Sequence, residues 1–211
     1  NGIYSTIVGG LGNSGTNLSN ILGGSNNITR HTYQTILGGS TNTNQSSGSL
    51  NNGIPSVIFG GSNNTCDAVG DIGSNPPSNF GPNVIGGGFS NSMNNNLSFF
   101  QNGSNVIFGG IQNKLERYPG SSYQRESVIN GGINNTIRSG LSSSICGGTG
   151  NNLYSQGGVI NGGNNNVIGS NNIDLPYITI SGGTQNVANG SYTTISGGSN
   201  NTASTFTNFS V

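Results

Sequence analysis

Residues with the chemistry for catalysis or metal binding are few in this sequence and far apart. His31 is the only histidine, and no cysteine lies near it, so the sequence indicates neither a catalytic triad nor a zinc site. Solenoids that cleave polysaccharides use carboxylates clustered on one strand face, whereas Asp67 and Asp71 lie in one irregular segment and do not recur. We therefore expect no enzyme activity, no metal ion and no cofactor.

One segment concentrates half of the charge. The chain has five Lys or Arg and five Asp or Glu, and five of these ten residues fall between positions 114 and 126, together with two tyrosines. Loops on a rigid scaffold often carry recognition, and tyrosine and arginine are enriched at contact surfaces. Two interpretations stay open: a loop that binds a host-surface protein or glycan, and a solvated loop with local ion pairs. The candidate binding residues are Lys114, Glu116, Arg117, Tyr118, Tyr123, Arg125 and Glu126.

Composition and charge exclude several classes of protein. The 211 residues include 39 Gly, 38 Asn, 31 Ser and 17 Thr, only 29% are hydrophobic, and there is no Trp. Folding must offset about 1–2 kcal/mol of chain entropy per residue, and this chain has too few large apolar side chains for a conventional core. A net charge of zero leaves no basic surface for nucleic acid. The apolar runs are far shorter than the roughly 20 residues of a membrane-spanning helix.

An internal repeat identifies the elements that must position these residues. The frame Ile-x-Gly-Gly-x-x-Asn occurs eleven times, and five of the ten intervals between its copies are 14–16 residues long. The repeated isoleucines are Ile7, Ile21, Ile36, Ile58, Ile85, Ile107, Ile129, Ile145, Ile160, Ile180 and Ile195. The repeated asparagines are Asn13, Asn27, Asn42, Asn64, Asn91, Asn113, Asn135, Asn151, Asn166, Asn186 and Asn201.

The residues around each Gly-Gly pair predict short strands and almost no helix. β-Branched residues precede the glycines, and a second small or apolar position follows the Asn in most copies. Glycine reaches φ > 0 without strain, so it favours a bend between the two strands. The recurring interval of 14–16 residues predicts an all-β fold, a parallel β-solenoid or β-roll of about eleven short coils with surface insertions. Stacked about 4.8 Å apart, these coils would form a rod on the order of 50 Å long.

The Ile column is expected to fill the interior, and the Asn column to line a corner. Such an Asn can form a ladder in which each amide bonds to its equivalent one coil away. It can also serve as a turn residue that tolerates the left-handed conformation. A turn alone would also accept Asp or Gly, and all eleven copies keep Asn, which favours the ladder.

At these columns the sequence resembles the head repeats of trimeric autotransporter adhesins, the YadA-like heads. Against the family pattern Val-x-Ile-Gly-x-x-Ser-x-Ala, this sequence has Ile195 at the Val position, Gly197 at the Ile, Gly198 at the Gly, Asn201 at the Ser and Ala203 at the Ala, and the two nearest copies read TISGGTQNVA and TISGGSNNTA. The resemblance implies a left-handed parallel β-roll, three chains side by side, and a surface adhesin without enzyme activity. Gly replaces an inward Ile, Asn replaces Ser, and insertions are many. Asn- and Gly-rich arrays of this kind could equally belong to fibres of large viruses.

The residue after each inward Ile should point outward, because neighbours in a strand face opposite sides. This position is apolar in most of the first half of the chain and polar in the second half. A continuous apolar stripe on a rod needs a cover. Either a second chain or the long insertions between residues 42 and 129 could supply it, and contact between chains is favoured. The predicted interface residues are Val8, Leu22, Leu37, Phe59 and Phe108.

The two cysteines are predicted to remain free thiols. The frame directs Cys66 inward and Cys146 outward, with four coils between them. Four coils correspond to about 19 Å along the axis, which is farther than a disulfide can span.

These observations predict a structural and adhesive fibre or head domain outside the cell, on a cell or virion surface. Residues 1–211 would form a single repeat domain within a longer chain, assembled as a homo-oligomer, a trimer by the resemblance. The alternatives are a structural fibre component of a large virus particle and a monomeric binding solenoid such as an ice-binding protein. Ice binding calls for a flat threonine array, which Thr179, Thr193 and Thr194 begin and other copies interrupt.

Overall fold

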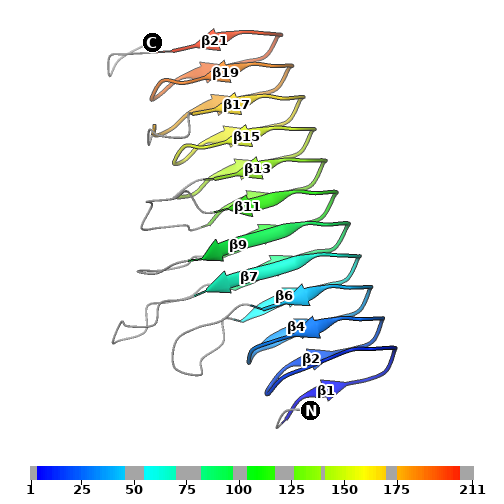
Figure 1. Cartoon of the computed structure of the whole chain (residues 1–211). Helices are drawn as coiled ribbons and strands as arrows, with labels where there is room; N and C mark the ends of the chain where they lie inside the picture. Colours follow the sequence, from blue (N-terminus) through cyan, green and yellow to red (C-terminus); the bar gives the residue numbers. More distant parts are fainter. Residues whose placement is uncertain are drawn as a thin grey trace, which may run out of the picture.

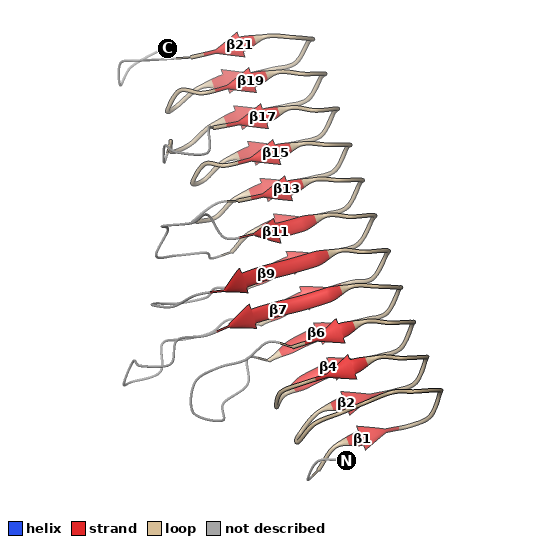
Figure 2. Cartoon of the chain, viewed as in Figure 1, coloured by secondary structure: helices blue, strands red, loops and turns tan. Residues whose placement is uncertain are grey.

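Short parallel strands stacked coil upon coil make up the fold (Figure 1). The computed structural model describes residues 4–45, 55–69, 82–96, 104–116, 126–138, 141–169 and 175–204. In these ranges it is all-β and contains no helix (Figure 2). The prediction of a parallel β-solenoid is confirmed, while its handedness stays a prediction.

The first sheet contains the strands that carry the repeated isoleucines. Its eleven strands are parallel, and each pairs with the equivalent strand of the next coil, as Ile85 pairs with Ile107. In order they are β1 (Thr6–Ile7), β2 (Asn20–Ile21), β4 (Gln34–Ile36), β6 (Ser56–Ile58), β8 (Asn83–Ile85), β10 (Asn105–Ile107), β12 (Val128–Ile129), β14 (Ser144–Ile145), β16 (Val159–Ile160), β18 (Thr179–Ile180) and β20 (Thr194–Ile195).

The second sheet contains the strands that follow the repeated asparagines. Its ten strands are also parallel and also pair between successive coils. They are β3 (Ile28–Thr29), β5 (Thr43–Asn44), β7 (Thr65–Val69), β9 (Ser92–Asn96), β11 (Lys114–Glu116), β13 (Thr136–Ile137), β15 (Asn152–Leu153), β17 (Val167–Ile168), β19 (Val187–Ala188) and β21 (Thr202–Ala203).

A third ladder runs along the corner between the two sheets. It consists of single parallel bridges made by the residue after each Gly-Gly pair, beginning with Leu11 to Ser25 and ending with Thr184 to Ser199. Each coil therefore pairs with its neighbours at three places, which satisfies the backbone N–H and C=O groups with little apolar burial.

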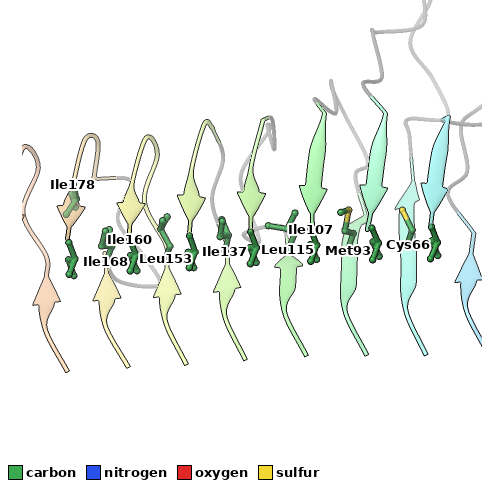
Figure 3. Close-up of a cluster of buried hydrophobic side chains, with 14 of the residues drawn as sticks. Cys66, Met93, Ile107, Leu115, Ile137, Leu153, Ile160, Ile168 and Ile178 are labelled. Carbon is green, nitrogen blue, oxygen red and sulfur yellow. The ribbon is translucent and has the colours of Figure 1, made fainter. Parts of the chain in front are cut away.

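The core is a narrow file of aliphatic side chains between the two sheets (Figure 3). The repeated isoleucines from Ile21 to Ile180 are fully buried, whereas Ile7 in the first coil is exposed. Facing them are the buried side chains of the second sheet, namely Cys66, Met93, Leu115, Ile137, Leu153, Ile168 and Ala188. The inward Ile column was predicted from the repeat, and in the second column the inward direction was predicted for Cys66.

In the first coils the inward position of the second sheet is polar, and its side chain forms a hydrogen bond with another buried polar residue. Thr29 donates from its hydroxyl to Ser19 at 2.8 Å. Asn44 donates to the Ser56 carbonyl at 3.0 Å, and the Ser56 hydroxyl donates back to the Asn44 side chain at 2.7 Å. All four residues are buried. Pairing inside the coil stack offsets the free energy lost when these groups leave water.

The repeated asparagines form the predicted ladder, with a partner set that differs from the prediction. Asn113 Nδ2 donates to the carbonyl of Gly109 in its own coil at 2.9 Å and to that of Gly132 in the next coil at 3.0 Å. Its Oδ1 accepts the backbone N–H of Asn135 at 3.0 Å. Direct bonds between amides, as from Asn64 to Asn42 at 3.1 Å, occur in some coils. The ladder therefore joins each amide mainly to backbone groups.

The left-handed conformation at this corner belongs to the residue before each ladder Asn. Asn26, Asn63 and Asn134 have φ values of 54–60°, and Asn165 has 54°. Asn tolerates this region better than most residues. The turn role considered for the ladder Asn is thus filled one position earlier.

Neither cysteine forms a disulfide in the structure, and Cys66 is buried while Cys146 is exposed, as predicted. The Cys66 thiol is therefore expected to react with a reagent such as Ellman's reagent only after the protein unfolds, because reaction requires an accessible thiolate. The C146S variant isolates this thiol for the measurement. Fast reaction of the folded C146S variant would contradict the inward register of Cys66.

Candidate functional site

The catalytic candidates do not come together. His31 is exposed, its backbone N–H bonding to Gln34 Oε1 at 3.0 Å. Asp67 lies in strand β7 and not in an irregular segment as expected, because the strand extends past Cys66 and pairs Asp67 with Asn94. Its Oδ2 accepts from Gln45 Nε2 at 2.9 Å, and Asp71 lies outside the described residues. No group of three or more His, Cys, Asp or Glu side chains that could hold a metal ion is found in the described part of the chain.

A small charged cluster lies on the outer side of the second sheet. Arg138 Nε donates to Glu116 Oε2 at 2.7 Å, and Lys114 Nζ lies 4.0 Å from Glu116 Oε1. The hydrogen bond with Glu116 raises the pKa of Arg138, against the opposing effect of burial. All three side chains remain partly exposed, so the ion pair between Arg138 and Glu116 contributes about 0–1 kcal/mol to stability.

This charged cluster includes part of the predicted binding segment and one residue that sequence reasoning missed. Glu126 lies elsewhere, where it accepts from the Ser142 hydroxyl at 3.3 Å. Arg138 joins because it follows Glu116 by 22 residues, one coil away along the same outer column. The remaining candidates, namely Arg117, Tyr118, Tyr123 and Arg125, lie outside the described residues.

The first sheet carries an outward column that we call the face column, made by the residue after each inward Ile. Its apolar members are exposed by 38–67% of their surface. Backbone bonds such as Phe108 N–H to the Ile129 carbonyl at 2.9 Å keep it in register from coil to coil. In coil order it reads Val8, Leu22, Leu37, Phe59, Gly86, Phe108, Asn130, Cys146, Asn161, Ser181 and Ser196.

A second outward column, the corner column, consists of the bridge residues after each Gly-Gly pair. Its apolar members are Leu11, Phe89, Ile111 and Ile133, which are 42–75% exposed. Sequence reasoning missed this column, although its fixed place after the glycines is visible in the repeat. In coil order it reads Leu11, Ser25, Ser40, Ser62, Phe89, Ile111, Ile133, Thr149, Asn164, Thr184 and Ser199.

The two columns together form an uncharged apolar surface on either side of one corner. Neither contains Asp, Glu, Lys or Arg. With about 150–250 Å² for a large side chain, the exposed apolar members amount to about 500 Å² in the face column and about 400 Å² in the corner column. The largest apolar patch on a monomer is usually about 300–600 Å², and each column amounts to an area within that range.

The described ranges end and begin again at another edge of the coil stack. Six gaps separate the described ranges. Each gap follows a strand of the second sheet and precedes the next strand of the first sheet. The Gly-Gly bends follow the first-sheet strands and gather along the opposite edge in Figure 1. The apolar columns therefore lie beside the corner that carries no insertion.

Comparison with known protein families and with curated proteins finds no match to this chain. The resemblance to YadA-like heads thus stays a prediction. In the described ranges no helix is long and apolar enough to cross a membrane.

Proposed function

We propose that this chain is a structural and adhesive part of an extracellular fibre, assembled side by side with copies of itself. The observation that carries the proposal is the pair of uncharged apolar columns along a stack of coils held by parallel pairing. A standard interface removes about 800 Å² per partner from water, of which about 57% is apolar. The apolar part of such an interface is therefore about 460 Å² per partner, which is close to the exposed apolar area of each column.

A trimer uses both columns. A closed ring uses two different patches of each chain, and a three-fold axis near the Gly-Gly corner would cover both columns. The resemblance to trimeric adhesin heads supports the same number of chains.

The edge that carries the insertions would face away from such an axis. Loops placed on a rigid scaffold often carry binding residues, and the described cluster of Lys114, Glu116 and Arg138 lies beside one of these insertions. We propose that the insertions contact a host-surface protein or glycan. The chain has no net charge, and the backbone groups of each coil are hydrogen-bonded to the neighbouring coils. Both properties suit exposure on a cell or virion surface.

Replacing Phe59 and Phe108 together by serine is expected to convert a trimer into a monomer of 21.3 kDa. The change removes the two aromatic anchors of the face column, and exposed aromatic residues commonly dominate interface energies. Light scattering after size-exclusion chromatography measures the mass. Because both rings are exposed, the far-UV circular dichroism should not change.

Tyr33→Ser is the matched control, since Tyr33 is equally exposed and lies outside both columns. It should leave the mass at three chains. A double serine variant that keeps the mass of the parent protein would contradict assembly through the face column.

A further inference from the structure

We infer that the outer face of the second sheet binds a neutral, extended β-1,4-linked glycan along a straight column of polar side chains. This inference rests on the adhesive part of the proposed function and gives it a site and a ligand class. The site consists of residues on the coils themselves, in addition to the insertions. It follows from where the fold collects its charged side chains.

The column, which we call the polar column, is made by the residue three positions after each ladder Asn. Backbone pairing keeps it in register, as Asp67 pairs with Asn94 and Asn94 with Glu116. All members from the second coil to the eighth are at least partly exposed, and each ends in a guanidinium, amide, carboxylate or phenol group. In coil order they are Arg30, Gln45, Asp67, Asn94, Glu116, Arg138 and Tyr154.

Charge is concentrated in the polar column. Six Lys, Arg, Asp or Glu residues lie in the described part of the chain, and four of them belong to this column. The face column and the corner column contain none. The four residues are two arginines and two acids, so the polar column has no net charge. A neutral ligand suits such a surface, because a strongly charged polymer of either sign would meet like charges along it.

Neighbouring members hold the two carboxylates of the polar column in place. Gln45 Nε2 donates to Asp67 Oδ2 at 2.9 Å. One part of the column further on, Arg138 Nε donates to Glu116 Oε2 at 2.7 Å. Each bond uses one carboxylate oxygen, so the other oxygen can accept a hydrogen bond from a ligand hydroxyl. Such charge-assisted bonds are stronger than neutral ones, and fixing the side chains in advance lowers the entropy cost of binding.

The spacing of the two acids matches an extended glycan. Asp67 and Glu116 are two coils apart, or about 10 Å, and the exposed Asn94 lies midway between them. In an extended β-1,4-linked glycan every second sugar presents the same hydroxyl groups to the same side, over a length close to that of two coils. Such a chain would repeat its contacts in step with the protein. An α-1,4-linked glycan curves and would leave the straight column.

Tyr154 adds an aromatic surface at the end of the polar column. Its ring can pack against the C–H groups of a sugar while its hydroxyl stays in water. The next coil has Gly169 at the same position, so the column places no side chain beside Tyr154 on that side. The column therefore offers hydrogen-bonding groups and one apolar surface, and a sugar ring has both hydroxyl and C–H groups.

The proposed assembly leaves the polar column uncovered. This column lies where the second-sheet strands end, and the Gly-Gly bends lie along the opposite edge of the coil stack (Figure 1). Neighbouring chains would cover the two apolar columns beside those bends. A glycan and the neighbouring chains would thus use different sides of the stack.

Isothermal titration calorimetry of the unmodified chain with three neutral hexasaccharides tests the inference. Cellohexaose and chitohexaose are β-1,4-linked, and maltohexaose is the α-1,4-linked control. At least one β-linked probe should bind, with a dissociation constant about tenfold lower than that of maltohexaose, as expected for one charge-assisted hydrogen bond. Binding by neither β-linked probe, or equal binding of all three probes, would overturn the inference.

The double variant Asp67→Asn, Glu116→Gln tests the site itself. It removes both carboxylates, keeps the side-chain shapes, and should weaken binding of the β-linked probe about tenfold. Ser92→Ala is the matched control, since Ser92 points outward from the same strand as Asn94 but lies outside the polar column. It should bind like the parent protein. Unchanged affinity in the double variant would contradict binding at the polar column.

The mass of the same samples separates this inference from the proposed assembly. A trimeric mass without glycan binding would overturn the site and leave the assembly standing. Column-dependent glycan binding by a monomer of 21.3 kDa would support the site and overturn the assembly.

Discussion

The Gly132→Ala variant is expected to lose about 4 kcal/mol of unfolding free energy or to fail to fold. Gly132 has φ +87°, and an added Cβ would collide with the carbonyl oxygen of Gly148 in the next coil. It would also lie 2.6 Å from Asn135 Nδ2 and 2.9 Å from Gly148 N, distances that Cβ atoms do not adopt. These neighbours are backbone and ladder atoms that cannot move without separating the coils. Urea unfolding followed by circular dichroism measures the loss.

Gly131→Ala is the control for this prediction. Gly131 has φ +151° and no atom of another residue within 4 Å of an added Cβ, apart from its chain neighbours. Its replacement should cost only the backbone strain, about 1–3 kcal/mol. Equal losses at the two positions would show that close stacking of the coils is not what requires the second glycine.

The Asn113→Asp variant is expected to lose about 3–5 kcal/mol of unfolding free energy at pH 7, since it breaks a buried polar network. Asn113 is fully buried, and its Nδ2 donates to two carbonyl oxygens. A carboxylate has the same shape but would point an acceptor at both of these oxygens. Burial and the two carbonyls disfavour the ionised form, so the pKa of the new carboxyl should rise in the folded state.

The pH dependence gives this prediction a second readout. Because the folded pKa is raised above the unfolded value of about 3.9, the extra loss is absent below that pH. It grows as the pH rises towards the folded pKa and is constant above it. Asn134→Asp is the control, since Asn134 is exposed with φ 59°, a conformation that Asp also tolerates. It should change stability by less than about 0.5 kcal/mol, and equal effects at the two positions would contradict the buried ladder.

The columns of the solenoid could be predicted because every coil repeats the same environment. Ile107 and Asn113 recur with fixed spacing to the Gly-Gly pair, so periodicity alone places one inside and the other at the corner. The partners of Asn113 could not be predicted in the same way. The carbonyl of Gly132 comes within reach only when the bends of two coils stack, and sequence spacing does not specify that distance.

The corner column shows where pattern reasoning stops. Alternation along a strand predicts which side a residue faces. It correctly predicted that Phe108, which follows the inward Ile107, points outward. Ile111 forms a single bridge outside any strand, so alternation says nothing about its direction. The pairing of Glu116 with Arg138 was missed because an insertion separates them in sequence, although they are one coil apart.

The mass of the unmodified chain in solution tests the central claim most directly. Sedimentation equilibrium over a range of concentrations is expected to give a particle of three chains, because the two apolar columns would be covered by neighbouring copies. A mass of 21.3 kDa at every concentration would contradict side-by-side assembly and leave a monomeric rod with an exposed apolar corner.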